Sequence, residues 1–496
     1  MRRLVEDEPV SGGPDPDGGA DGGDWHGHWD MDERLPLTLG NLARAVDGRL
    51  CAGEPSIVVR GLSIDSRSLN AGDLFVAIRG DRFDGHTFVA DALARGALGA
   101  LVSDETALGP SPAVGLVVED TLRALQMASR YVRRASGATV VAITGSAGKT
   151  TTKELTAAAL TSSYKVFRSR GNLNNHIGLP LSLLELRDRP EIAVVELGMN
   201  APGEISRLIT LAEPELRVWT NVAEVHSAFF PSIEAIADAK AEILDGATAE
   251  TVVVANADDA RVMARLAGVP ARVATFGVGG DADVTATEVE ERGLDGTRAL
   301  VQTPVGPARV TTPLLGRGNL ANVLAAMTVA IQLQVPVAVA AERVAMVEAP
   351  PGRGQIHRLS NGVVVVDDSY NANPTAVNAA VLTLARDRRE GRRVAVLGEM
   401  LELGRRATPL HVETGRAVAS AGVGLLVTVG GEPARALGQA AIEAGLGSAD
   451  VLHCEDSESA ATRLGPLVRE GDLVLVKGSR GVRTETVVAR LVEEWT

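Results

Sequence analysis

Short runs of consecutive apolar residues, each followed by glycine or polar residues and then by a helix-like segment, constrain this chain more than any other feature. Such runs are typical of strands that are buried on both faces of a parallel sheet. They form two sets, at residues 139–143, 192–195, 217–219 and 252–254, and at residues 363–366, 394–397, 425–429 and 473–476. Because helical segments separate the runs, two open α/β sheets are predicted.

The 496 residues suggest about three domains, at ~150 residues per domain. We predict an N-terminal domain at residues 34–136, a central domain at residues 137–348 and a C-terminal domain at residues 349–496. Residues 1–33 are rich in glycine, aspartate and proline and lack the apolar centre of a signal peptide. They are therefore predicted to form a disordered leader.

The charge and the cysteine content of the chain indicate which partners and which cellular compartment are compatible with it. The formal net charge of −14 argues against nucleic acid or an anionic membrane surface as a partner. No apolar run approaches the ~20 residues that a membrane span needs. Cys51 and Cys454 match no metal-binding or redox spacing, which favours two thiols in a reducing compartment. We therefore expect a cytoplasmic protein, and one that acts as a monomer.

The predicted strand at residues 139–143 runs into a glycine-rich turn and then a helix-like segment. The generic phosphate loop has four residues between its glycines, whereas Gly145 and Gly148 have two between them. The turn still presents backbone N–H groups at a helix N-terminus, where the dipole favours an anion. Lys149 is placed to reach the β- and γ-phosphates of ATP, and Thr150 to bind Mg²⁺. The residues expected to bind ATP here are Gly145, Ser146, Ala147, Gly148, Lys149, Thr150 and Thr151.

A phosphate loop alone leaves GTPases, kinases and ligases open, so polar residues further along the chain decide the class. Glu196 ends the predicted strand at residues 192–195, where ligands of open α/β sheets bind and a carboxylate can hold Mg²⁺. His226 follows the next predicted strand, and Lys240 lies on a predicted helix at residues 233–244. Taken singly, Glu196 is also explained as a helix cap, His226 as a structural histidine and Lys240 as a solvated lysine.

Taken together, these segments resemble the Mur ligase family. The phosphate loop, residues 172–180, Glu196, His226 and Lys240 occur in the family's order and approximate spacing, and the resemblance extends from residue 37 to about residue 488. It implies an α/β fold of three domains: a small domain that binds a UDP-linked precursor, a central phosphate-loop ATPase-like domain with a parallel sheet, and a Rossmann-like C-terminal domain.

The resemblance also implies the reacting groups. Two Mg²⁺ ions are expected, held by Thr150, Glu196, His226 and Lys240. Lys240 is expected to react with CO₂ and form a carbamate, which turns a cation into an anionic oxygen ligand. The implied catalytic residues are Lys149, Glu196, His226, Lys240 and Arg353.

Further residues are implied to bind ATP and substrate. Asn319, Asn322, Asp368 and Tyr370 join the phosphate loop as expected ATP-binding residues. Most relatives carry histidine where this chain has Gly318, so any contact made by that imidazole is missing. The expected substrate-binding residues are Asp65, Ser66, Arg67, Asp84, His86, Asn175, His176, Asn371, Asn373, Ser479 and Arg480.

Within the family, residues 368–374, 397–404 and 477–481 resemble the ligase that adds D-alanyl-D-alanine to UDP-MurNAc-tripeptide. The implied reaction passes through an acyl phosphate and is the last cytoplasmic step that gives UDP-MurNAc-pentapeptide for peptidoglycan. Closure about hinges near Gly137 and residues 349–354 is expected to exclude water. The sequence assigns no base for the incoming amine, with His357 and His411 as candidates, and does not choose the third residue of the tripeptide.

Three alternatives stay open at this stage. The first is another amide ligase, such as the third-residue Mur ligase, a folylpolyglutamate-type enzyme or a cyanophycin-type enzyme. The chain has no Asp-Asn-Pro-Arg segment, which is typical of the third-residue ligase. The second is a nucleotide-dependent switch, which the absence of an Asn-Lys-x-Asp segment disfavours. The third is a regulator that binds UDP-linked precursors without catalysis.

Overall fold

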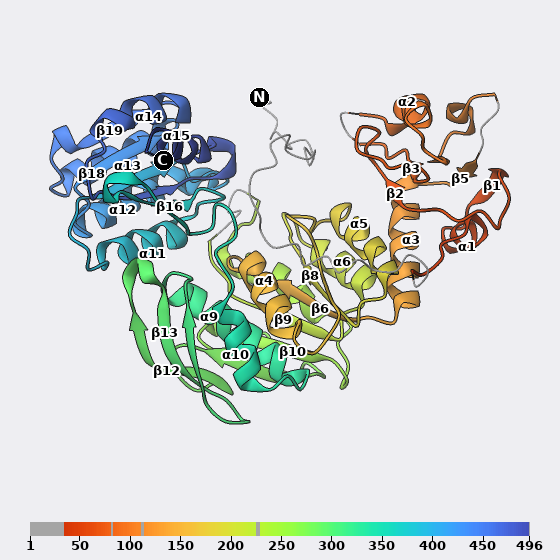
Figure 1. Cartoon of the computed structure of the whole chain (residues 1–496), viewed down its shortest axis with the longest axis horizontal. Helices are drawn as coiled ribbons and strands as arrows, with labels where there is room; N and C mark the ends of the chain where they lie inside the picture. Colours follow the sequence, from red (N-terminus) through yellow and green to blue (C-terminus); the bar gives the residue numbers. More distant parts are fainter. Residues whose placement is uncertain (1–33, 81–82, 111–113, 225–228, 496) are drawn as a thin grey trace. The chain divides into compact units, whose positions relative to one another are not determined.

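The computed structural model describes residues 34–80, 83–110, 114–224 and 229–495 (Figure 1). It divides into two compact units. Unit 1 comprises the residues up to Gly137 together with Leu183–Arg189, and unit 2 comprises Ala138–Ser182 and Pro190–Thr496. The predicted leader and His226 lie outside the described residues. The domain boundaries predicted from the sequence stay predictions.

Unit 1 is built on one five-stranded sheet. The strand order is β1-β5-β4-β3-β2, with β1 antiparallel to β5 and the other neighbours parallel. Phe75, Ala100 and Val102 point into a core that helix α2 covers. The elements are α1 (Leu39–Ala45), β1 (Arg49–Ala52), β2 (Leu62–Ser63), β3 (Leu74–Val76), α2 (Val89–Ala94), β4 (Gly99–Val102), β5 (Gly115–Val117) and α3 (Thr121–Ser136).

Arg187 attaches the segment Leu183–Arg189 to the rest of unit 1. Its guanidinium donates to the backbone oxygens of Leu35, at 3.0 Å, and Arg60, at 2.9 Å. Burial lowers the pKa of Arg187 to about 10, and the neighbouring Arg34 acts in the same direction. A buried cation therefore holds two chain segments that are distant in sequence.

Unit 2 contains a nine-stranded sheet of order β14-β13-β12-β11-β10-β9-β6-β8-β7. The strands from β7 to β12 are parallel, and β13 and β14 extend the sheet in antiparallel pairing. The strands are β6 (Thr139–Thr144), β7 (Val166–Arg168), β8 (Ile192–Glu196), β9 (Leu216–Trp219), β10 (Val252–Asn256), β11 (Arg272–Gly277), β12 (Val284–Glu291), β13 (Thr297–Gln302) and β14 (Ala308–Thr312).

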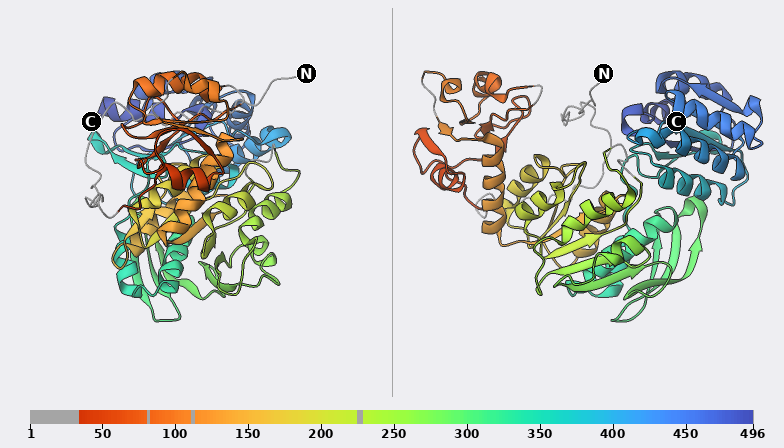
Figure 2. Two further views of the ribbon diagram at one scale, coloured as in Figure 1. Left: turned by 90° about the vertical axis from the view of Figure 1, so that its right-hand side faces the viewer. Right: turned by 180° about the vertical axis from the view of Figure 1, so that it is seen from behind.

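Helices cover both faces of this sheet. On one face α4, α9 and α10 pack together over the strands (Figures 1 and 2), and the core there includes Ile143, Val194 and Val218. On the other face α7 contacts both α6 and α8. The helices are α4 (Lys149–Leu160), α5 (Gly178–Leu184), α6 (Glu204–Ala212), α7 (Ile233–Ala241), α8 (Ala260–Ala264), α9 (Gly316–Gln332) and α10 (Val337–Ala345).

The C-terminal part of unit 2 is a six-stranded sheet of order β15-β16-β20-β17-β18-β19, in which only β15 pairs antiparallel. Successive residues of one strand enter opposite cores, with Val366 on one face and Val365 on the other. The elements are β15 (Gln355–Arg358), β16 (Val364–Asp368), α11 (Pro374–Ala385), β17 (Arg393–Gly398), α12 (Ala407–Ser420), β18 (Leu425–Val429), α13 (Glu432–Glu443), β19 (Val451–Cys454), α14 (Ser457–Leu464), β20 (Leu473–Lys477) and α15 (Glu485–Trp495).

The structure confirms the predicted α/β class and the strands that the apolar runs indicated, because those runs are buried on both sheet faces. The helix expected at residues 233–244 ends as a regular helix at Ala241 and continues as a 3₁₀ turn, Glu242–Leu244. Strands β12, β13 and β14 were not predicted. Only one of their faces is buried, so they alternate between buried and exposed residues rather than forming apolar runs.

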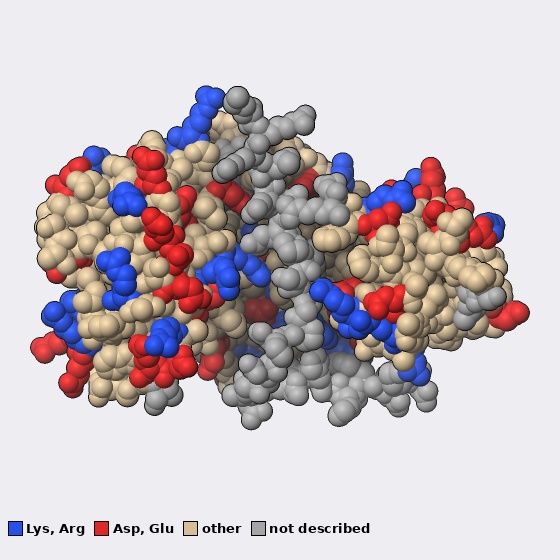
Figure 3. Space-filling view, turned by 90° about the horizontal axis from the view of Figure 1, so that it is seen from above, with Lys and Arg blue, Asp and Glu red and all other residues tan. Residues whose placement is uncertain are grey.

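Acidic and basic side chains are interspersed over the described surface on the side that Figure 3 draws. No helix among the described residues is both long enough and apolar enough to cross a membrane.

Replacing Arg187 by leucine is expected to destabilise the protein. The backbone oxygens of Leu35 and Arg60 would lose their buried donors, at a cost of about 1–3 kcal/mol each. Urea denaturation measures the change. The control is Arg189→Gln at the exposed neighbouring arginine, which should leave the midpoint unchanged. Equal midpoints for Arg187→Leu and the control would contradict the anchoring role.

Candidate active site

The phosphate loop connects β6 to α4 and depends on two glycines. Gly145 has a φ of +151° and Gly148 has a φ of +83°, both of which disfavour L side chains. A Cβ on Gly145 would lie 1.9 Å from Thr220 Oγ1, and one on Gly148 would lie 2.3 Å from Asn322 Oδ1. The spacing of two residues between the glycines therefore fits a turn that is packed tightly against two neighbouring segments.

Thr220 and Asn221, which directly follow β9, hold this loop in place. The backbone N–H of Ala147 donates to Asn221 Oδ1 at 2.9 Å, and that of Ser146 donates to the Asn221 backbone oxygen at 3.0 Å. Thr220 Oγ1 donates to the Ala147 backbone oxygen at 2.7 Å. We did not single out these two residues from the sequence. Their position at the carboxyl end of a buried strand, beside the phosphate loop, was the available signal.

Lys149 and Lys240 converge on one backbone oxygen. Lys149 Nζ lies 3.0 Å and Lys240 Nζ lies 3.1 Å from the carbonyl oxygen of Gly145. Burial and the nearby Lys149 hold the pKa of Lys240 well below its usual value. Burial also lowers the pKa of Lys149, the Glu196 carboxylate opposes that change, and Arg353 adds to it. The structure thus places Lys149 and Lys240, two of the residues implied to be catalytic, on one carbonyl oxygen, and the charges of Glu196 and Arg353 act on Lys149.

Glu196 lies at the end of β8 with its side chain almost fully buried. Its Oε2 accepts from Thr150 Oγ1 at 2.7 Å, and its Oε1 accepts from Asn174 Nδ2 at 2.8 Å. A hydroxyl and a carboxylate that meet beside a phosphate loop are the oxygen ligands that Mg²⁺ prefers. Thr150 and Glu196 therefore fit one Mg²⁺ ion. His226, predicted to hold a second ion, lies outside the described residues.

Within the described residues, no group of three or more His, Cys, Asp and Glu side chains is arranged to hold a metal ion. The predicted ligand set does not depend on such a group, because it draws on a threonine and a lysine.

The start of α9 lies against the phosphate loop. Asn322 Oδ1 accepts from Thr152 Oγ1 at 3.2 Å, and Asn322 Nδ2 donates to Asn319 Oδ1 at 3.1 Å. Asn319 Nδ2 in turn donates to the Leu315 backbone oxygen at 2.9 Å. A Cβ at Gly318 would meet no atom within 4 Å. A side chain at position 318 would therefore meet no steric obstacle at its Cβ. Thr151, on α4, is buried.

Tyr370 stacks with two arginines in the C-terminal part of unit 2. The Arg353 guanidinium carbon lies 3.9 Å from the centre of the Tyr370 ring, and that of Arg480 lies 5.3 Å away. Asp368, at the end of β16, forms a 2.7 Å ion pair with Lys477. Lys477 also donates to the Asn371 backbone oxygen at 2.8 Å. Positively charged and aromatic groups thus gather near the carboxyl ends of β16 and β20.

Several residues predicted to bind substrate hold the backbone in this structure. Asn373 caps α11 by accepting from the N–H of Ala376 at 2.9 Å, and Asn371 Oδ1 accepts from the N–H of Ala372 at 2.9 Å. Ser479 is buried and accepts from the N–H of Leu401 at 2.9 Å. Asn175 accepts from the N–H of Gly178 at 2.8 Å, at the start of α5, and the adjacent His176 is exposed.

His411, a candidate base for the amine, has a structural role, because both of its ring nitrogens are bonded to backbone groups. Its Nε2 accepts from the N–H of Met400 at 2.9 Å, so its Nδ1 carries the proton donated to the Ala407 backbone oxygen at 2.7 Å. Burial lowers its pKa. The ring is fully buried and both nitrogens are occupied, so His411 cannot take a proton from a substrate in this arrangement. His357 Nε2 is also buried, but it has no hydrogen-bond partner.

Unit 1 holds the remaining predicted substrate residues. Asp65 pairs with Arg67 at 2.7 Å, and Ser66 between them is buried. Asp84 Oδ1 accepts from His86 Nδ1 at 2.6 Å, and His86 Nε2 accepts from the N–H of Ser103 at 2.9 Å. Hydrogen bonds from His86 lower the pKa of Asp84 to about 2. Because Nε2 of His86 accepts a hydrogen bond, the ring proton lies on Nδ1, which faces Asp84.

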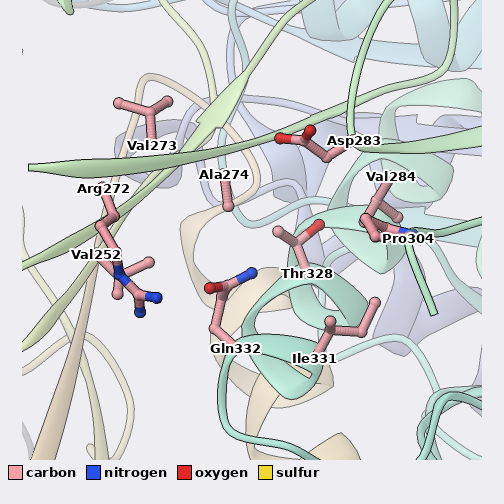
Figure 4. Close-up of a pocket in the computed structure, with 10 residues that line it drawn as sticks. All are labelled: Val252, Arg272, Val273, Ala274, Asp283, Val284, Pro304, Thr328, Ile331 and Gln332. Atoms are coloured by element: carbon pink, nitrogen blue, oxygen red, sulfur yellow. The ribbon is translucent and has the colours of Figure 1, made fainter.

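A pocket of about 250 Å³ lies beside the C-terminal end of α9, which is the end away from the phosphate loop. Figure 4 shows the residues that line this pocket. Val252 and Arg272, the first residues of β10 and β11, line it together with Gln332, the last residue of α9. Asn322 and Gln332 are ten residue steps apart, which is about 15 Å along a helix. This pocket is therefore separate from the candidate active site.

The low pKa of Asp84 predicts a loss of stability in acid. The Asp84 carboxylate stabilises the folded state fully at pH values above 3.8, the ordinary pKa of aspartate. That contribution disappears as the pH falls through about 2. Asp84→Asn is therefore expected to weaken the fall in melting temperature between pH 4 and pH 2. The control is Glu54→Gln, which changes an exposed carboxylate. If the melting temperature of Asp84→Asn falls between pH 4 and pH 2 as much as that of the native protein, Asp84 does not stabilise the fold in this way.

Comparison with known proteins supplies the family. Three family models match: the Mur ligase family catalytic domain at residues 58–160, the Mur ligase middle domain at residues 143–330 and the Mur ligase glutamate ligase domain at residues 352–480. A UDP-N-acetylmuramoyl-tripeptide--D-alanyl-D-alanine ligase from Escherichia coli (strain K12) is 36% identical over 466 residues, which is 93% of this chain and 100% of that protein.

Solved structures agree with this result. A crystal structure of MurF from Acinetobacter baumannii superposes with a TM-score of 0.84 at 31% identity, and covers 93% of this chain and 100% of that chain. The MurF ligase from Thermotoga maritima in complex with ADP has a TM-score of 0.76 at 30% identity, over 88% of this chain and 98% of that chain. On this full-length similarity and on the arrangement of the phosphate loop, the chain belongs to the Mur ligase family.

Proposed function

We propose that this protein is an ATP-dependent ligase that adds D-alanyl-D-alanine to UDP-MurNAc-tripeptide and so forms UDP-MurNAc-pentapeptide for peptidoglycan. The observation that carries the proposal is the meeting of Lys149, Thr150 and Glu196 at the phosphate loop of a chain that spans the full length of a ligase with that name. The likeness to the ligase solved with ADP supports ATP as the nucleotide.

The reaction proceeds in two steps. A carboxylate oxygen of the tripeptide attacks the γ-phosphorus of ATP, the bond to the β,γ-bridging oxygen breaks, and ADP and an acyl phosphate result. The amine of D-alanyl-D-alanine then attacks the acyl carbon, the carbon–oxygen bond to phosphate breaks, and the new amide loses one proton. Phosphoryl transfer of this kind needs positioning and charge neutralisation more than covalent protein chemistry.

The residues of this chain supply those needs. Lys149 reaches towards the phosphates, and Arg353 adds a second positive charge to the electrostatics of the site. Thr150 and Glu196 would hold Mg²⁺, which would supply neutralisation of the phosphate charge. The Tyr370 ring stacks against Arg353 and limits its orientation. We propose that His226 and carbamylated Lys240 hold a second Mg²⁺.

The other proposed assignments follow from the substrates. The domain at residues 34–136 binds the UDP moiety through Asp65 and Arg67, the central domain at residues 137–348 binds ATP, and the domain at residues 349–496 binds the dipeptide. Closure about the two connections would keep water from the acyl phosphate. We propose a cytoplasmic location, where ATP is available, and a monomer in solution.

The decisive experiment measures phosphate release from ATP with UDP-MurNAc-tripeptide, with and without D-alanyl-D-alanine. Release is expected to require both substrates and Mg²⁺, and mass spectrometry should detect the UDP-pentapeptide. Glu196→Gln should lower the rate by about 100-fold, because it removes the charge that holds the metal. Phosphate release with the tripeptide and a different amine would keep the ligase mechanism but would show that the second substrate is not D-alanyl-D-alanine. Release that ignores both substrates would refute the ligase function.

Lys240 is expected to form the carbamate, because a lowered pKa raises the share of neutral amine, which is the form that attacks CO₂. Protein equilibrated with ¹³C-bicarbonate should show a carbamate carbon resonance by NMR. The resonance should disappear in Lys240→Arg, because the guanidinium does not react, and should persist in Lys165→Arg. A spectrum of Lys240→Arg identical to that of the native protein would place the carbamate on another amine.

A further inference from the structure

Lys153 is a buried cation that the proposed chemistry does not use. Lysine and arginine together number 49 in this chain, but only five are lysines: Lys149, Lys153, Lys165, Lys240 and Lys477. Lys153 is 1% exposed, which makes it one of the most buried large side chains of the protein. A chain that uses arginine at most of its basic positions therefore has a lysine, whose ammonium is a compact point charge, at this buried position.

The ammonium group of Lys153 is bonded to the segment that follows β7. Nζ donates to the Ser169 backbone oxygen at 2.6 Å, and the Gly171 backbone oxygen lies 3.5 Å away. The carboxylate of Glu154 compensates the charge from 3.2 Å. None of these three groups belongs to the phosphate loop at residues 145–151.

The segment that Lys153 holds also holds Glu196. Ser169 Oγ accepts from the Glu196 backbone N–H at 3.4 Å. Asn174 Nδ2 donates to Glu196 Oε1 at 2.8 Å, and the Asn174 backbone oxygen accepts from the N–H of Gly198 at 2.8 Å. Residues 169–174 therefore contact Glu196 through both its backbone and its side chain.

These contacts form a closed ring that begins and ends on α4. Thr150 donates to Glu196 Oε2, Asn174 donates to Glu196 Oε1, and Lys153 ties the segment of Asn174 back to the helix that carries Thr150. A ring of this kind fixes both the distance and the orientation between a hydroxyl and a carboxylate. Partners of metal ligands set ligand geometry in this way, and their loss commonly lowers metal affinity about 10- to 100-fold.

We propose that Lys153 is a positioning residue for the Mg²⁺ site, which orients Glu196 by anchoring residues 169–174 to α4. The proposal rests on the proposed function, because that function supplies the metal. It assigns Lys153 no contact with ATP or substrate. Loss of the ammonium should therefore weaken binding of the divalent ion and leave nucleotide affinity without the metal unchanged.

The test uses the full chain, with Mn²⁺ as a probe for Mg²⁺ and a non-hydrolysable ATP analogue. Free Mn²⁺ is measured by electron paramagnetic resonance across a titration. Lys153→Met removes the ammonium and keeps an unbranched side chain, and it should raise the dissociation constant for Mn²⁺ about tenfold. The control is Lys165→Met, at a lysine that takes part in none of these contacts, and it should bind Mn²⁺ like the native protein. The Mg²⁺ concentration for half-maximal ligase rate should rise in parallel in Lys153→Met.

Four outcomes decide the proposal. A folded Lys153→Met that binds Mn²⁺ as the native protein does would overturn it. A folded Lys153→Met that loses nucleotide affinity in the absence of metal would overturn it as well, because Lys153 would then act on ATP. Native protein that binds no Mn²⁺–nucleotide complex would overturn both this proposal and the proposed function. If Lys153→Met does not fold, Ser169→Ala decides: an approximately threefold weaker Mn²⁺ affinity supports the ring, and an unchanged affinity refutes it.

Discussion

The pairing of three neighbouring strands, β8, β6 and β9, is the constraint on which the candidate site depends. Ile143 pairs with Glu196, and Thr144 pairs with Trp219, so the carboxyl ends of these strands meet at one edge of the sheet. Thr150 and Glu196 are thereby brought into contact across 46 residues of sequence, and Ala147 and Asn221 across 74. The hydrophobic cores on both faces of the sheet fix that pairing, and the polar groups at its edge take their positions from it.

Electrostatics at this edge favour an anion although the chain as a whole is acidic. Two lysines share the Gly145 carbonyl oxygen, and burial lowers the pKa of both. Two amines this close repel each other when both are charged, and a phosphate between them would remove that cost. The net charge of −14 therefore does not oppose nucleotide binding, because the field at the site is set by groups within a few ångströms.

Many polar residues around the site maintain its shape rather than contact a ligand. Asn373 caps a helix, Ser479 holds the backbone at Leu401, and both nitrogens of His411 are occupied. Buried polar groups need hydrogen-bond partners, and these residues provide them to the backbone around the site. Residue type alone cannot separate these roles, because the same asparagine or histidine serves as a cap or as a ligand according to what lies beside it.

The sequence by itself determined the fold class, the buried parallel strands, the phosphate loop and the placement of Glu196 at a strand end, because each of these leaves a local pattern of apolar runs, glycines and strand-end acids. It did not reveal β12, β13 and β14, whose alternating pattern is weak. Only the tertiary structure decided that Thr220 and Asn221 hold the phosphate loop, that Arg187 ties unit 1 together, and that Lys153 reaches the segment beside Glu196. Those roles depend on which distant segments become neighbours, and strand order and helix packing fix this without leaving a local sequence pattern.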